Sequence, residues 1–335
     1  MLPDVLTLDK ITGAILGTFT GDALGMPVEG WSSWEISERY GEITEILPGR
    51  LKAGSYTDDT EMMIGIAESL LECGDFNDQH MALTFSRNFN HERGYGPGTT
   101  RVLQLIKSGT PWEQAVQNVF PGGSYGNGAA MRIAPAACLY VGRPDELRKC
   151  AAGSARLTHA HPQAVEGAAL QASAVALALT ADSQYPLDQK GFLRSLKSSL
   201  PPEAGEYREK LDCAGKLLEI EPSVDRIVRE LGNGVKASQS VCTSIYIFLE
   251  NYGSFEKAVV KAVSLGGDTD TIGAMTGAIS GAYHGRKEIP GRWLDKLEEG
   301  QKGRGYVEEL AAGLWLLLSD SQSCTLQIKK RKEDL

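Results

Sequence analysis

Two segments of the chain carry glycine at every fourth position, and this spacing limits how the chain can fold. The two rows consist of Gly13, Gly17, Gly21 and Gly25 and of Gly273, Gly277 and Gly281. Residues four apart lie on one face of an α-helix, so each row forms a stripe along one helix. Each glycine costs about 1 kcal/mol of helix propensity relative to alanine. We therefore expect the backbone of another helix to pack closely against each stripe.

Helical periodicity also dominates the rest of the chain. Segment 59–73 places its apolar residues on one face and is followed by Gly74, a typical helix stop. Segment 163–180 is rich in alanine and leucine and almost uncharged, as expected of a buried helix. Segment 241–249 is rich in β-branched and aromatic residues and fits a strand or a helix. Because strand and helix patterns do not alternate and no clear linker divides the chain, we predict an all-α fold with one domain over residues 1–335, a core at about 10–320 and a frayed tail at 321–335.

Composition and charge exclude several classes of partner. The net charge of −9 and the pI of about 5.2 argue against a DNA groove or a polybasic membrane surface. We expect no membrane span, because no apolar run reaches about 18 residues. The six cysteines have no metal-binding spacing, and the first ten residues lack the features of a secretory signal. These features predict reduced thiols and a cytoplasmic protein.

Two acidic clusters precede apolar helical segments. The first reads Thr-Asp-Asp-Thr at 57–60, and the second reads Asp-Thr-Asp-Thr at 268–271 after the glycine pair 266–267. Either cluster alone is typical of a helix N-cap, but adjacent carboxylates repel, and a helix dipole offsets only about 0.3–1 kcal/mol per charge. Carboxylates and hydroxyls are hard ligands suited to Mg²⁺, Mn²⁺ or Ca²⁺. Four carboxylates exceed what one Mg²⁺ needs, so the clusters together favour a binuclear site. The glycine pair is expected to allow a tight turn into that site.

Six motifs resemble those of the ADP-ribosylglycohydrolases in their order and spacing. They are GDALGMPVE (21–29), YTDDTEM (56–62), RGYGPG (93–98), GSYGNGAAMR (123–132), LTHAHP (157–162) and SLGGDTDTIGAMTGAISGAYHG (264–285). The paired acidic motifs are specific in combination, and the resemblance covers roughly residues 10–320. It implies a compact orthogonal helix bundle and a site with two divalent cations, Mg²⁺ or Mn²⁺. It also implies hydrolysis at the anomeric carbon of ADP-ribose.

The resemblance further implies roles for the acidic motifs. The implied metal ligands are Thr57, Asp58, Asp59, Asp268, Asp270 and Thr271. Glu29 matches a mobile acidic residue and is the candidate general acid or base, so the expected catalytic set is Glu29, Asp58 and Asp270. Asp22 has either a direct role or the role of a buried carboxylate bonded to neighbouring amides. Thr269 is expected to point elsewhere and to cap its helix.

The same resemblance implies a set of residues around ADP-ribose. They are Gly94, Gly98, Phe120, Gly123, Ser124, Tyr125, Gly126, Asn127, His159 and Val235. The glycines would let backbone amides approach the pyrophosphate, and Tyr125 resembles an aromatic residue that stacks on adenine. Phe120 would complete the sandwich, although its spacing to Gly123 is one residue shorter than in the serine-directed members. Asn127 is expected to fix the turn, and Val235 either lines the pocket or belongs to the core.

The choice of substrate depends on the acceptor joined to ADP-ribose. The motifs are most similar to those of the serine-directed and poly(ADP-ribose)-cleaving members, which implies an O-linked substrate: ADP-ribosyl-serine, poly(ADP-ribose) or O-acetyl-ADP-ribose. An arginine-linked, N-glycosidic substrate is an alternative. Two other readings are a non-catalytic ADP-ribose-binding or structural protein on the same fold and a two-metal phosphohydrolase that cleaves the pyrophosphate. We expect a monomer that acts on an ADP-ribosylated protein or conjugate.

Overall fold

Seventeen α-helices and four short 3₁₀-helices make up the computed structural model, which describes residues 4–333, with side chains as far as residue 320. The described residues include no strand, only two isolated bridges, so the all-α prediction is confirmed. In chain order the α-helices are α1 (Leu8–Gly25), α2 (Ser33–Tyr40), α3 (Asp58–Cys73), α4 (Asp78–Asn88), α5 (Pro97–Lys107), α6 (Trp112–Val119), α7 (Ala134–Leu139), α8 (Pro144–Arg156), α9 (Pro162–Thr180), α10 (Gln189–Ser199), α11 (Gly205–Leu217), α12 (Val224–Leu231), α13 (Ala237–Glu250), α14 (Phe255–Val263), α15 (Thr269–His284), α16 (Gly291–Leu294) and α17 (Arg304–Glu333). The 3₁₀-helices are η1 (Met26–Val28), η2 (His91–Arg93), η3 (Asn127–Ala129) and η4 (Arg286–Glu288). Segment 241–249, which fitted a strand or a helix, lies in α13.

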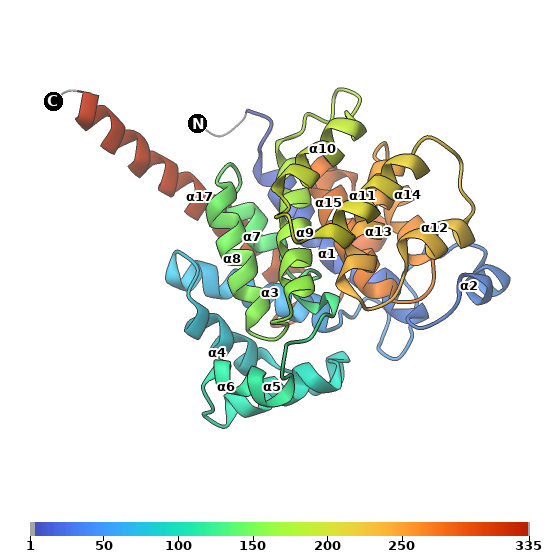
Figure 1. Cartoon of the computed structure of the whole chain (residues 1–335), viewed down its shortest axis with the longest axis horizontal. Coiled ribbons are helices and arrows are strands. Elements are labelled where there is room, and N and C mark those ends of the chain that lie inside the picture. The colour runs from blue at the N-terminus through green and yellow to red at the C-terminus, as the bar shows by residue number, and fades with distance from the viewer. Residues whose placement is uncertain (1–3, 334–335) are drawn as a thin grey trace.

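The two glycine rows face each other across the contact between α1 and α15, in the middle of the molecule (Figure 1). A Cβ atom built on Gly17 would lie 2.1 Å from the carbonyl oxygen of Gly277, and one built on Gly13 would lie 2.3 Å from that of Gly281. The pairing runs in opposite directions along the two helices, so they are antiparallel. The expected close packing is therefore confirmed, and the partner of each row is the other row.

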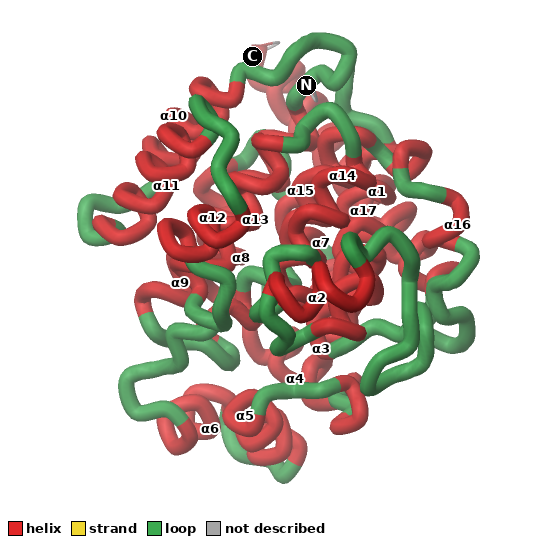
Figure 2. The backbone as a smooth tube through the Cα atoms, turned by 90° about the vertical axis from the view of Figure 1, so that its right-hand side faces the viewer, coloured by secondary structure: helices red, strands yellow, loops and turns green. Residues whose placement is uncertain are grey.

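Other helices cover this central pair. Helices α3 and α17 pack against α1, and α9, α13 and α14 pack against α15. Helices α4, α5 and α6 form a lobe at one end of the molecule in both views (Figures 1 and 2). The loop that enters α5 and the loop that follows α6 carry two of the glycine-rich motifs. Residues of both motifs line one cavity together with Asp58, at the start of α3.

Helix α17 forms the C-terminal part of the described chain, and its end extends away from the other helices (Figure 1). Segment 321–333, which we expected to be frayed, is helical, whereas residues 334 and 335 of the expected tail lie outside the described residues. Among the described helices, none combines the length and the apolar character needed to cross a membrane.

Candidate metal and ligand site

Helix α1 holds the start of α3 through Asp22. The buried carboxylate of Asp22 accepts hydrogen bonds from the backbone N–H of Thr57 at 3.0 Å and from the backbone N–H and the hydroxyl of Thr60 at 3.2 and 2.6 Å. These donors belong to the first turn of α3 and its cap, where no intrahelical partner exists. Of the two interpretations of Asp22, the geometry therefore supports the buried carboxylate bonded to neighbouring amides.

The same helix also contacts the start of α15. A Cβ atom on Gly25 would lie 2.3 Å from the carbonyl oxygen of Thr269, whose hydroxyl donates a hydrogen bond to the carbonyl oxygen of Gly25 at 2.9 Å. Thr269 thus points away from the other acidic-motif side chains, as expected. The expected cap is wrong, because the hydroxyl bonds to α1 and the backbone N-cap residue of α15 is Asp268.

A tight turn leads into α15 at the glycine pair. Gly266 and Gly267 have φ values of +70° and +76°, which side chains other than glycine rarely adopt. A Cβ atom on Gly267 would lie 2.3 Å from the carbonyl oxygen of Asn233, and the next residue, Asp268, donates its N–H to that oxygen at 2.9 Å. The turn expected from the sequence is confirmed, and it fixes the backbone of Asp268.

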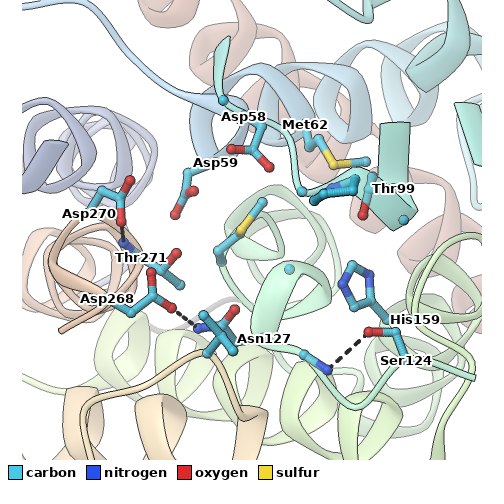
Figure 3. A pocket seen from close by; sticks show the side chains of 18 of the residues that line it. Asp58, Asp59, Met62, Thr99, Ser124, Asn127, His159, Asp268, Asp270 and Thr271 are labelled. Carbon is cyan, nitrogen blue, oxygen red and sulfur yellow. Dashed lines mark hydrogen bonds between the residues drawn. The ribbon is translucent and has the colours of Figure 1, made fainter. Parts of the chain in front are cut away.

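The starts of α3 and α15 bring the two acidic motifs together. Figure 3 shows the side chains of Asp268, Asp270 and Thr271 on the left of the pocket and those of Asp58 and Asp59 above and beside them. One oxygen each from Glu29, Asp268 and Asp270 lies within 4.8 Å of the others, so this group could hold a metal ion. The contact between two motifs that are about 200 residues apart in the chain follows from their shared support on α1.

The electrostatics of these carboxylates fit a bound cation. Burial raises the pKa of Asp58 to about 8, with a further contribution from the charge of Asp22, and burial raises the pKa values of Asp59 and Asp270 well above the usual range. Burial also raises the pKa of Asp268, although the hydrogen bond from Asn127 opposes the shift. The buried Oδ1 of Asp59 has no hydrogen-bond partner. Ionised carboxylates are costly in such a place without positive charge, and a divalent cation supplies that charge.

Thr57 and Thr271, the two expected threonine ligands, have different surroundings. Thr271 lines the pocket beside Asp270. Thr57 is fully buried and lies outside the pocket lining; its hydroxyl accepts from the N–H of Asp59 and donates to the carboxylate of Asp59, both at 3.2 Å. The structure thus places Thr57 as the N-cap of α3 and as a support for Asp59.

A cavity of about 430 Å³ runs from the acidic residues to the two glycine-rich loops. Of the expected site residues, its lining includes Glu29, Asp58, Asp59, Gly94, Gly98, Phe120, Ser124, Gly126, Asn127, His159, Val235, Asp268, Asp270 and Thr271. The lining also includes Gly128, one of the glycines of the GSYGNGAAMR motif, and residues that sequence reasoning missed as site residues, namely Met62, Gly96, Pro97, Thr99 and Met131. For Met62 a signal existed, because it follows Asp58 by four residues and therefore lies on the same face of α3.

The loop at 120–128 shapes the end of the cavity away from the acidic residues. Gly123 and Tyr125 do not line the cavity: Gly123 packs against the backbone of His161, and the 55% exposed ring of Tyr125 has edge contact with the ring of His161. The hydroxyl of Ser124 accepts a hydrogen bond from the N–H of Gly126 at 3.2 Å (Figure 3). Tyr125 thus lies outside the cavity lining, and stacking of its ring on adenine stays a prediction.

Asn127 links this loop to the acidic residues. Its side-chain amide donates to Oδ2 of Asp268 at 2.5 Å (Figure 3) and to the hydroxyl of Ser240 at 3.0 Å. Its backbone N–H donates to the carbonyl oxygen of Val235 at 2.9 Å. Asn127 thus ties the loop to other segments and orients Asp268.

His159 lies in the wall of the cavity as a neutral imidazole. Burial, together with the charge of Arg132, lowers the pKa of His159 to about 3. Its Nδ1 is 2.8 Å from the hydroxyl of Thr158, and its ring packs against Gly128, where a Cβ atom would lie 2.6 Å from the ring. At neutral pH this side chain can bond to a ligand but carries no charge.

Arg50 reaches the acidic residues from the loop between α2 and α3, and no sequence motif indicated it. Its Nη2 is 2.8 Å from Oε2 of Glu29 and 3.4 Å from Oδ2 of Asp270. Its Nη1 donates to the carbonyl oxygen of Arg93, at the start of the RGYGPG motif, at 3.2 Å.

Comparison with known proteins gives consistent matches over most of the chain. The family model described as ADP-ribosylglycohydrolase matches residues 3–324. The chain is 35% identical to ADP-ribosylhydrolase ARH3 of Homo sapiens, over 90% of this chain and 91% of that protein. It is 29% identical to ADP-ribosyl-[dinitrogen reductase] glycohydrolase of Rhodospirillum rubrum, over 87% and 90%. A solved structure described as an ADP-ribosylglycohydrolase-related protein complex has a TM-score of 0.72 and 30% identity, and the match covers 93% of this chain and 98% of that one.

Proposed function

The chain belongs to the ADP-ribosylglycohydrolase family, and on this premise we propose that it is a metal-dependent hydrolase that releases ADP-ribose from an O-linked acceptor. The observation that carries the proposal is the meeting of two acidic helix starts at one end of a cavity whose other end is formed by glycine-rich loops. A cavity of about 430 Å³ is within the range for small-molecule sites, roughly 300–1,000 Å³. An elongated ligand with a sugar at one end and a nucleotide at the other fits this arrangement.

The acidic end would hold two divalent cations, Mg²⁺ or Mn²⁺. The proposed ligands are Thr57, Asp58, Asp59, Asp268, Asp270 and Thr271. When bound, the cations would supply Lewis acidity and a template that orients the hydroxyls of the distal ribose and the attacking water. The contribution of the chain is to fix the carboxylates: Asp22 holds the start of α3, and Asn127 orients Asp268.

Glu29 is the proposed general acid or base. It follows η1, lies on the cavity wall and is 40% exposed, whereas the side chain of Asp270 is 4% exposed. A carboxylate at the rim can exchange a proton with solvent more readily than a buried carboxylate that binds metal. An acid or base at the anomeric carbon needs such an exchange.

The other end of the cavity would bind the adenosine and the pyrophosphate. In this proposal the glycines of the loop let backbone amides approach the pyrophosphate, and the rings of Tyr125 and Phe120 enclose the adenine. Phe120 is held over Gly98, where a Cβ atom would lie 1.9 Å from the ring. Gly98 therefore keeps the Phe120 ring close to the cavity wall.

The acceptor is proposed from motif similarity to the serine-directed and poly(ADP-ribose)-cleaving members. The direct test is incubation with peptides that carry ADP-ribose on serine or on arginine, each with Mg²⁺ and with Mn²⁺. We expect release of free ADP-ribose from the serine-linked peptide at a rate at least about tenfold above that from the arginine-linked peptide. Preference for the arginine-linked peptide would assign the alternative acceptor.

The products also separate the other readings. AMP as the product would identify a phosphohydrolase, and binding of ADP-ribose without turnover would identify a non-catalytic protein. Asp270→Asn removes a proposed ligand and should abolish turnover. Asp295→Asn, which changes an exposed carboxylate in contact with Arg304, is the matched control and should keep the turnover of wild type.

A further inference from the structure

Arg50 donates to two members of the three-carboxylate group that could hold a metal ion. Its Nε and Nη2 donate to Oε2 of Glu29 at 3.1 and 2.8 Å, and Nη2 lies 3.4 Å from Oδ2 of Asp270. Glu29 and Asp270 therefore have a positive partner that belongs to the chain itself. We propose that Arg50 is a positioning residue that holds these two carboxylates and competes with a metal ion for them. This inference rests on the metal site of the proposed function.

Arg50 and a bound cation would use some of the same carboxylate oxygens, so both cannot make all their contacts at once. One oxygen each from Glu29, Asp268 and Asp270 lies within 4.8 Å of the others, so a cation bound by Asp270 would compete with the guanidinium for the oxygens of this group. Two positive groups at that point would also repel each other. The exchange replaces one cation by another, so the carboxylates keep a counter-charge in both states.

The neighbouring loop is shaped to accommodate the guanidinium. Gly94 has a φ of +91°, and a Cβ atom there would lie 2.0 Å from Nη1 of Arg50. The same Nη1 donates to the carbonyl oxygen of Arg93 at 3.2 Å. Because Gly94 and Gly98 of the same loop also line the ligand cavity, the position of Arg50 connects the acidic residues to the ligand-binding loop.

The backbone around Arg50 is anchored, so the side chain is the part that can move. The N–H of Gly49 donates to the carbonyl oxygen of Leu51 at 2.9 Å, and a Cβ atom on Gly49 would lie 2.6 Å from Cα of Pro27. The side chain of Arg50 is 35% exposed, so rotation about its own bonds can bring the guanidinium into solvent. Displacement of Arg50 therefore requires no change in the fold.

The test is Mn²⁺ binding measured by titration calorimetry in the absence of substrate, with wild-type protein, Arg50→Ala and Arg50→Lys. If the guanidinium competes with metal, Arg50→Ala should bind Mn²⁺ more tightly than wild type by at least about threefold. Arg50→Lys, which keeps the charge and loses the planar fork, should lie between the two. In EDTA, Arg50→Ala should unfold at a lower temperature than wild type, and Mn²⁺ should raise its unfolding temperature by more than it raises that of wild type.

Arg292→Ala is the matched control, because Arg292 also bridges two carboxylates, those of Glu45 and Glu256, and is 42% exposed. It should lower stability without changing the affinity for Mn²⁺. Equal or weaker Mn²⁺ binding by Arg50→Ala overturns the proposal, as does the absence of Mn²⁺ binding in both wild type and Arg50→Ala. If Arg50→Ala binds Mn²⁺ more tightly but no ADP-ribosyl peptide is cleaved, the proposed activity fails while this inference stands.

Discussion

Gly21 and Gly273 lie in backbone contact: a Cβ atom on Gly21 would fall 2.0 Å from the carbonyl oxygen of Gly273. The next residue after Gly21 is Asp22, which accepts hydrogen bonds from the first turn of α3. Two adjacent residues of α1 therefore fix α15 on one side and α3 on the other. Since each of these helices begins with an acidic motif, α1 is the common support that brings the two motifs together.

The first prediction concerns this helix contact. Gly21→Ala should lower the free energy of unfolding by about 1–3 kcal/mol, because the new methyl group meets backbone that cannot move without separating the helices. The gain in helix propensity, about 1 kcal/mol, offsets only part of this cost. The measurement is urea denaturation followed by circular dichroism.

Gly215→Ala, inside α11, is the control for this prediction. A Cβ atom there meets only Cδ1 of Leu193 at 3.5 Å, an ordinary contact, so this change should leave the protein as stable as wild type or more stable. Equal effects of the two substitutions would contradict close packing of α1 on α15.

The second prediction is a dependence of stability on pH that metal removes. Burial raises the pKa of Asp58 from 3.8 to about 8, and it raises the pKa values of Asp59 and Asp270 well above 3.8. These groups bind more protons in the folded than in the unfolded chain, so the free energy of unfolding should fall as pH rises from about 7 to about 8. Histidines of the unfolded chain, with a pKa of about 6.5, are mostly neutral over this range.

Urea denaturation at the two pH values, in EDTA and in excess MgCl₂, measures this effect. Mg²⁺ binds the ionised carboxylates, so the fall in stability should be present in EDTA and should be reduced or reversed in MgCl₂. A stability that rises over this range in EDTA would show that these carboxylates are already ionised and compensated without metal.

The third prediction concerns proton transfer. Glu29→Gln keeps the size of the side chain and removes its ability to exchange a proton, so kcat should fall by about 10²-fold or more, with a smaller change in KM. Steady-state kinetics on an ADP-ribosyl-serine peptide provide the measurement. Glu38→Gln, an exposed change on α2, should leave both constants unchanged. A turnover of Glu29→Gln within a few-fold of wild type would remove Glu29 from the role of acid or base.

The helical nature of the fold could be predicted from the sequence because its signals are local. Glycine at every fourth position and apolar periodicity report on a single helix, and both predictions are confirmed. The partner of each glycine row could not be deduced, because a stripe of glycines describes a surface without specifying what covers it. The role of Asp22 was similarly open, and the cap expected of Thr269 was wrong, since each of these side chains bonds to a helix distant in the sequence.

The motifs of the candidate site could be found in the sequence, but the contacts between them could not be predicted from it. Residues of the acidic motifs and of the two loops line one cavity. Arg50 carries no motif and reaches this cavity because its loop folds against segment 93–94. The exposed position of the Tyr125 ring also depends on a tertiary contact, with His161. Such contacts depend on how distant segments pack, which no local pattern in one sequence records.

The central claim is that the acidic motifs hold metal ions on which hydrolysis depends. Its most direct test is the release of ADP-ribose from an ADP-ribosyl-serine peptide by protein treated with EDTA and by the same protein after addition of Mg²⁺ or Mn²⁺. We predict that the EDTA-treated protein is inactive and that Mg²⁺ or Mn²⁺ restores the release of free ADP-ribose. Full activity in the metal-free protein would contradict the claim.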